Sequence, residues 1–97
     1  MQTVSAVVPF HNDGATIART LDSLATQTHS PLEVVVIDDA SSPDQAQALD
    51  ALAEGWPTDR PPLRVLHLAT NAGPAGARNQ GWAAASGDWI AFCDADD

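Results

Sequence analysis

Four short apolar runs alternate with segments of helical spacing along this chain, and this alternation restricts the fold more than any other feature. The runs occupy residues 3–9, 33–38, 63–68 and 89–93. Strands that alternate with helices through short connections form parallel sheets with helices on both faces. The sequence therefore predicts an α/β fold with three α/β/α layers around a mainly parallel, Rossmann-like sheet.

The composition of these runs indicates strands that are covered on both faces. Residues 33–38 (EVVVID) are the clearest case, because successive β-branched residues suit a buried pleated surface better than a helix. The last run, from Trp89 to Cys93, is rich in aromatic and branched residues. We expect this last run to form a buried strand as well.

Three segments with helical spacing connect the runs. The first follows Asn12, with Asn12 or Asp13 as its cap, and the second begins at the cap residue Ser42. Residues 71–76 are rich in turn formers and are expected to form a loop. The third helix is then predicted over residues 77–85, with Trp82 facing the sheet.

Carboxylates follow two of the predicted strands. Asp38 and Asp39 end the second run, and Asp94 and Asp96 follow the fourth. In open α/β sheets, ligands bind beyond the carboxyl ends of the strands. The Asp-x-Asp spacing lets both carboxylates reach one hard cation, which prefers oxygen ligands. The sequence thus predicts a cation at this edge, and such a cation would hold phosphates.

Length, charge and missing residue types exclude several classes of function. The 97 residues make one small domain, and their net charge of −9 makes nucleic acid and anionic membranes poor partners. The chain has no lysine, which excludes a Walker-type phosphate loop and Schiff-base chemistry. Its single cysteine forms no disulfide framework, and we detect no signal peptide and no segment of bilayer-spanning length.

Four segments resemble, in order, the motifs of family 2 glycosyltransferases with the GT-A fold. They are residues 4–12 (VSAVVPFHN), 33–41 (EVVVIDDAS), 71–81 (NAGPAGARNQG) and 86–97 (SGDWIAFCDADD). A lone Asp-x-Asp occurs widely by chance, but four motifs in the right order over nearly the whole chain are a specific signal. The resemblance implies that residues 1–97 are the N-terminal, nucleotide-diphospho-sugar-binding part of a GT-A domain that is cut after the Asp-x-Asp motif.

The resemblance also implies roles for individual residues in binding the nucleotide. In the family, the segment after the first strand lines the nucleotide pocket, and this carries over to Pro9 and His11. An acid after the second strand hydrogen-bonds the base, which carries over to Asp39 with Asp38 beside it. His11 departs from the family, where an aromatic residue more usually precedes the asparagine and stacks on the base.

The Asp-x-Asp motif and one arginine complete the site that the resemblance implies. Asp94 is expected to contact the ribose, and Asp94 and Asp96 to coordinate Mn²⁺ or Mg²⁺ on the diphosphate. Arg78 is expected at the nucleotide or phosphate side of the pocket. Such a cation stabilises the diphosphate as it leaves. The family's catalytic base and acceptor pocket lie beyond Asp97, so no catalytic residue is expected within the chain, and the isolated chain is expected not to transfer sugar.

The expected partners are the sugar donor and an acceptor that is a saccharide, a lipid or a protein. A cytoplasmic location, or one at the cytoplasmic face of a membrane in a longer protein, is expected because sugar nucleotides are made there. We also expect homo-oligomers that form through surface normally covered by the missing half of the domain.

Alternative interpretations remain for most of these residues. Asp94 and Asp96 could cap a turn, and Asp38 could be structural while its neighbour is functional. Arg78 could form a structural ion pair, and His67 could be an exposed or packing residue. Two other classes of protein also fit: a non-catalytic nucleotide-binding or assembly module, and a Mg²⁺-dependent phosphoryl-transfer or receiver-like domain. The missing lysine speaks against the latter.

Overall fold

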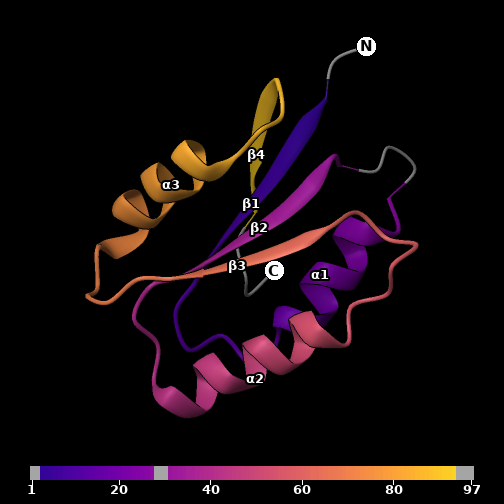
Figure 1. Cartoon of the computed structure of the whole chain (residues 1–97). Coiled ribbons are helices and arrows are strands. Elements are labelled where there is room, and N and C mark those ends of the chain that lie inside the picture. The colour runs from indigo at the N-terminus through magenta and orange to yellow at the C-terminus, as the bar shows by residue number, and fades with distance from the viewer. Residues whose placement is uncertain (1–2, 28–30, 94–97) are drawn as a thin grey trace.

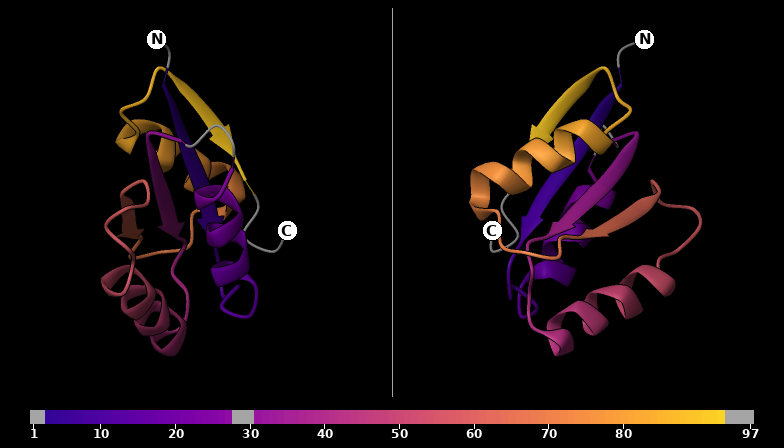
Figure 2. Two further views of the ribbon diagram at one scale, coloured as in Figure 1. Left: turned by 90° about the vertical axis from the view of Figure 1, so that its right-hand side faces the viewer. Right: turned by 60° about the vertical axis from the view of Figure 1, so that its left-hand side comes forward.

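The computed structural model describes residues 3–27 and 31–93, which form a four-stranded parallel sheet between helices. The strands are β1 (Val4–Phe10), β2 (Glu33–Asp38), β3 (Leu63–His67) and β4 (Trp89–Phe92), in the order β3-β2-β1-β4. The helices are α1 (Ile17–Ala25), α2 (Pro43–Glu54) and α3 (Gly73–Ala84). Helices α1 and α2 lie on one side of the sheet and α3 on the other (Figures 1 and 2). The predicted α/β class and its layers are confirmed.

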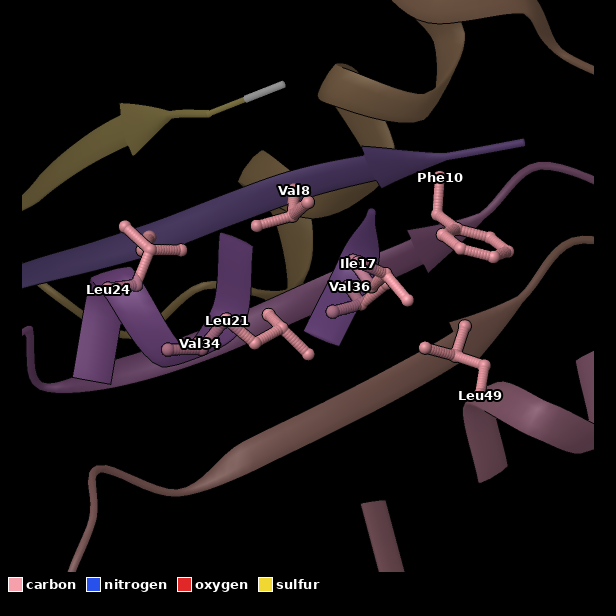
Figure 3. Close-up of a cluster of buried hydrophobic side chains, with 9 residues drawn as sticks. Val8, Phe10, Ile17, Leu21, Leu24, Val34, Val36 and Leu49 are labelled. Carbon is pink, nitrogen blue, oxygen red and sulfur yellow. The ribbon is translucent and has the colours of Figure 1, made fainter. Parts of the chain in front are cut away.

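Alternate residues of the two central strands face opposite layers of the core. Val8, Val34 and Val36 pack against α1 and α2, as Figure 3 shows with the leucines and isoleucine of those helices. Val35 and Ile37 pack on the other face, against α3. Because side chains alternate along a strand, this parity fixes the face on which every later residue of β2 emerges.

A buried carboxylate, Glu33, lies at the end of the sheet where the strands begin. Glu33 Oε2 accepts hydrogen bonds from the Ser5 hydroxyl at 2.8 Å and from the Ser86 amide at 2.7 Å, and Arg64 lies 3.2 Å from Oε1. Burial raises the pKa of Glu33, but the hydrogen bonds from Ser86 and Ser5 and the charge of Arg64 outweigh burial and hold the pKa below its ordinary value. At this end of the sheet, the buried carboxylate is therefore fully engaged with groups of the protein itself.

Two helix starts differ from the sequence-based prediction. Helix α1 begins at Ile17 and not directly after Asn12, which instead adopts a left-handed backbone conformation with φ 56°. Helix α3 begins at Gly73, so most of the predicted loop at 71–76 is its first turn. Proline suits the first turn of a helix because its missing N–H is not needed there, and Pro74 occupies that turn. No helix in the described ranges is long and apolar enough to cross a bilayer.

Three aromatic residues that we expected to be buried are exposed. Trp82 on α3, Trp89 on β4 and Phe92 on β4 are 64%, 57% and 41% exposed, and the rings of Trp82 and Phe92 lie 6.5 Å apart. The reason is that β4 pairs only with β1 within the described residues, so its other edge and this side of α3 have no neighbour there. Self-association through such a surface stays a prediction.

Candidate functional site

A pocket of about 240 Å³ opens where β1 and β2 end and α3 begins. In Figure 1 the carboxyl ends of β1, β2 and β3 gather at the left, beside the loop that leads into α3. Pro9, His11 and Asp13 line the pocket from the end of β1 and its loop, Asp39 lines it from the residue after β2, and Arg78 lines it from α3. Four of the predicted site residues (Pro9, His11, Asp39 and Arg78) are thus brought together.

Asp39 is the buried carboxylate of this pocket, with only 4% of its surface exposed. Its Oδ1 accepts the Ala72 N–H at 2.6 Å, and its own N–H donates to the Phe10 carbonyl at 2.8 Å. Ala72 is the residue before α3, where a negative charge is favoured by the helix dipole. Oδ2 of Asp39 has no hydrogen-bond partner among the described residues, so one acceptor oxygen remains available to a ligand.

The His11 ring is held against the same residue. Its Nδ1 lies 2.7 Å from the Asp39 carbonyl oxygen, and the His11 N–H donates to Asp13 Oδ2 at 3.1 Å. A carbonyl oxygen only accepts hydrogen bonds, so Nδ1 must carry the proton. Within residues 3–27 and 31–93, no hydrogen bond of the other ring nitrogen, Nε2, is found.

The two loops that carry these residues are tied together by a pair of side-chain bonds. Asn12 Oδ1 accepts the Ser42 N–H at 3.0 Å, and the Asn12 N–H donates to the Ser41 hydroxyl at 2.9 Å. Asn12 and Ala40 both have φ 56°, a conformation that costs a non-glycine residue about 1–2 kcal/mol. Strain of this kind collects at functional sites, where surrounding contacts hold it in place.

Asp38, which we expected beside Asp39 in the nucleotide site, does not line the pocket. It emerges on the opposite face of the sheet, where its Oδ1 accepts the Ser41 N–H at 3.1 Å and its Oδ2 lies 2.6 Å from His67 Nδ1. Burial raises the pKa of Asp38, but hydrogen bonds from Ser41 and His67 outweigh it and hold the pKa below its ordinary value. This placement favours the alternative in which Asp38 is structural.

Arg78 is half-buried at the pocket and forms no ion pair or hydrogen bond within the described ranges. Arg60 and Arg64, by contrast, pair with Asp22 and Glu33. The alternative in which Arg78 forms a structural ion pair with a site acid is thus not found here. Its guanidinium is free to contact an anion.

Asp94 and Asp96, the predicted metal ligands, lie outside the described residues. Strand β4 runs parallel to β1, with Phe92 paired to Val7 and the Cys93 N–H donating to the Val7 carbonyl at 3.0 Å. Within residues 3–27 and 31–93, no group of three or more His, Cys, Asp or Glu side chains is placed to hold a metal ion.

Sequence reasoning missed some of the pocket lining. Asp13 was seen only as a possible helix cap, while Gly73 and Pro74 were assigned to a loop. The proline itself could have indicated the earlier helix start, because it is favoured in a first turn. The role of His67 was missed as well, since nothing in the local sequence shows that it meets Asp38.

Comparisons with known proteins agree on one family. The model of Glycosyl transferase family 2 matches residues 5–97. The chain is 38% identical over 94 residues to the uncharacterized glycosyltransferase YibD of Escherichia coli, a match that covers 97% of this chain and 26% of YibD. The chain spans about a quarter of the length of the curated relatives it matches.

Two solved structures extend this similarity to the fold. The mannosyltransferase PcManGT of Pyrobaculum calidifontis, in complex with GDP-Man and Mn²⁺, has a TM-score of 0.84 and 30% identity over 98% of this chain and 28% of its own. TarS of S. aureus, in complex with UDP-GlcNAc, has a TM-score of 0.78 and 34% identity over 97% of this chain and 26% of its own.

Proposed function

The chain belongs to glycosyl transferase family 2, and from this premise we propose that its pocket binds the nucleoside diphosphate of a sugar donor for transfer to an acceptor. The observation that carries the proposal is that one pocket brings together a buried carboxylate, Asp39, and a guanidinium, Arg78, that has no ion-pair partner among the described residues. The carboxylate can accept a hydrogen bond from a nucleotide base, and the guanidinium can donate hydrogen bonds to a phosphate. The pocket's placement at the carboxyl edge of the sheet supports the same assignment.

The free oxygen of Asp39 favours some bases over others. Uracil, thymine and guanine each present a ring N–H on the edge that pairs with other bases, whereas adenine and cytosine present an unprotonated ring nitrogen there. An ionised carboxylate can only accept, so it pairs with the ring N–H of the first three bases and meets a lone pair at the ring nitrogen of the other two. The complexes of PcManGT with GDP-Man and of TarS with UDP-GlcNAc are in line with this selection.

We further propose that Asp94 and Asp96 hold Mn²⁺ or Mg²⁺ and that Asp94 also contacts the ribose. Two carboxylates are a donor set that suits hard divalent cations. When bound, such a cation would neutralise charge on the departing diphosphate. The chain's own contribution is to fix the base through Asp39 and to place Arg78 beside the phosphates.

Titration calorimetry of the chain with UDP, GDP, dTDP and ADP, each with and without Mn²⁺, tests the proposal. We expect one of the first three to bind, more tightly with Mn²⁺, and ADP to bind poorly. Asp96→Ala should remove the effect of Mn²⁺, whereas Asp59→Ala, at an exposed site between α2 and β3, should not. Failure of all four to bind at millimolar concentration would contradict the proposal and favour a module without a donor site.

Sugar transfer by the 97 residues alone is not expected. The chain spans about a quarter of its relatives' length, and its pocket of about 240 Å³ is smaller than the roughly 300–1,000 Å³ that hold small ligands. This size suits the nucleoside part of a donor more than a donor together with an acceptor. Detection of product from the isolated chain with UDP-sugars or GDP-sugars would contradict this expectation.

Replacing Arg78 by alanine should weaken binding of the diphosphate but not of the nucleoside. Loss of a hydrogen bond to a charged group lowers affinity about 10- to 100-fold. UDP and uridine, or the corresponding guanine pair, should be titrated side by side at two salt concentrations. Arg19→Ala, on the exposed surface of α1, is the matched control for loss of one positive charge. Equal losses for UDP and uridine would show that Arg78 supports the fold and not the phosphates.

A further inference from the structure

His67, the last residue of β3, joins three elements through its two ring nitrogens. Nδ1 lies 2.6 Å from Asp38 Oδ2 at the end of β2, and Nε2 lies 2.7 Å from Asp50 Oδ1 on α2. Asp38 is almost completely buried, whereas Asp50 is exposed. Only a protonated imidazole can donate from both nitrogens at once, so this geometry is that of an imidazolium between two carboxylates.

Asp38 also holds the turn that carries Asp39 into the pocket. Asp38 uses its other oxygen, Oδ1, to accept the Ser41 N–H at 3.1 Å, which spans the turn over Asp39 and Ala40. The turn contains the strained backbone of Ala40 at φ 56°. Its far end is tied to the loop after β1 through the Ser41 hydroxyl, which accepts the Asn12 N–H. Asp39 is therefore held in place by a network that begins at His67.

We propose that His67 is a positioning residue for nucleotide binding: as an imidazolium between Asp38 and Asp50, it fixes the turn that carries Asp39, so nucleotide affinity falls when His67 loses its proton. This inference rests on the proposed donor-binding function of the pocket. His67 does not line the pocket and acts only through Asp38.

The direction of the pH effect follows from the groups around the ring. Hydrogen bonds to Asp50 and then Asp38 raise the pKa of His67, and burial opposes them less strongly. Within the described residues, Asp38 from β2 and Asp50 from α2 are the charged groups that face the ring, while Arg64 on β3 is engaged with Glu33 and the Ala84 carbonyl. A raised pKa means that the protonated arrangement is fully present below about pH 6.5 and is lost as pH rises through the higher folded value.

Asp38 titrates far from this range. Its pKa is lowered, so the carboxylate is present above about pH 3.9 and is lost only as pH falls through its folded value. Between these limits the network is complete. On the alkaline side the neutral ring can donate from only one nitrogen, and the buried Asp38 loses its charged partner.

Titration of the chain with UDP and GDP in the presence of Mn²⁺, from pH 5.5 to 8.5, tests the proposal. We expect affinity to fall about fivefold on the alkaline side, which corresponds to about 1 kcal/mol for replacing a charged hydrogen bond by a neutral one. Asp50→Asn should move the midpoint of this fall to lower pH, and His67→Gln should remove it. Asp44→Asn, an exposed acid on the same helix, should leave it unchanged. Parallel pH profiles for wild type and His67→Gln would overturn the proposal.

A measurement without nucleotide separates this inference from the proposed function. The NMR shifts of the Ser41 and Ala72 amides, which donate to Asp38 and Asp39, should follow the titration of the His67 ring in the wild type. The milder Asp50→Asn variant should move the titration of the His67 ring and the pH dependence of these amide shifts together to lower pH. This variant still tests the proposal if His67→Gln does not fold. If no nucleotide binds but these amides follow His67, the proposed function fails and the positioning network stands. Amide shifts that do not change as His67 titrates would contradict the proposed network.

Discussion

Asp39→Asn is expected to weaken nucleotide binding about 10- to 100-fold and to leave the fold intact. Asparagine is isosteric, and its carbonyl oxygen can still accept the Ala72 N–H that Asp39 Oδ1 accepts at 2.6 Å. The second oxygen becomes an NH₂ group, which meets the ring N–H of the base as one donor facing another. The variant thus loses a hydrogen bond to a charged acceptor, and that loss costs about 1.5–3 kcal/mol.

Calorimetry with the nucleoside as well as the diphosphate locates this effect. Because Asp39 is proposed to contact the base, uridine or guanosine should lose as much affinity as the diphosphate does, which is the opposite of the result expected for Arg78→Ala. Asp59→Asn removes the same charge from an exposed site between α2 and β3 and should bind like the wild type. A wild-type affinity in a folded Asp39→Asn variant would remove Asp39 from the site.

Gly81→Ala should lower the free energy of unfolding by about 1–3 kcal/mol. Gly81 is buried on the face of α3 that rests on the sheet, and an added Cβ would overlap Val7 Cγ1 and lie 3.3 Å from Ile37 Cγ1. Both neighbours are completely buried, so neither side chain can move aside. The helix must instead shift away from β1 and β2. That is a large effect for a small domain, whose total stability is of the order of 5–15 kcal/mol.

The same change should also reach the pocket, because α3 carries Arg78 and its first turn lines the site. Urea unfolding measures the stability, and titration with UDP and GDP measures the accompanying loss of affinity. Gly55→Ala is the matched control: Gly55 follows α2 with φ −86°, and the nearest atom to an added Cβ is 3.7 Å away. If Gly81→Ala and Gly55→Ala unfold at the same urea concentration, the close approach of α3 to the sheet does not limit stability.

The sequence by itself determined the order of elements and the edge at which the site forms. Runs such as Glu33–Asp38 are too short and too β-branched for helices, and helices between them require parallel strands with their carboxyl ends at one edge. Acids that follow such strands must gather there, which is why Asp39 could be expected in the pocket. These conclusions depend only on local spacing and chain direction.

Contacts between distant segments were decided only by the tertiary structure. The exposure of Trp82 and Trp89 depends on which strand borders β4, and strand order is a global property. The pairing of His67 with Asp50 likewise depends on how α2 packs beside β3. No local sequence pattern indicates either arrangement.

The separation of Asp38 from Asp39 shows the same division most clearly. Alternation along β2 places neighbouring side chains on opposite faces, which the sequence alone could indicate. Which face holds α3 and the pocket, and which holds α2 and His67, follows from the packing of the helices across the sheet. The sequence supplied two adjacent acids, and the layer that each one meets made Asp39 a candidate ligand-binding residue and Asp38 its support.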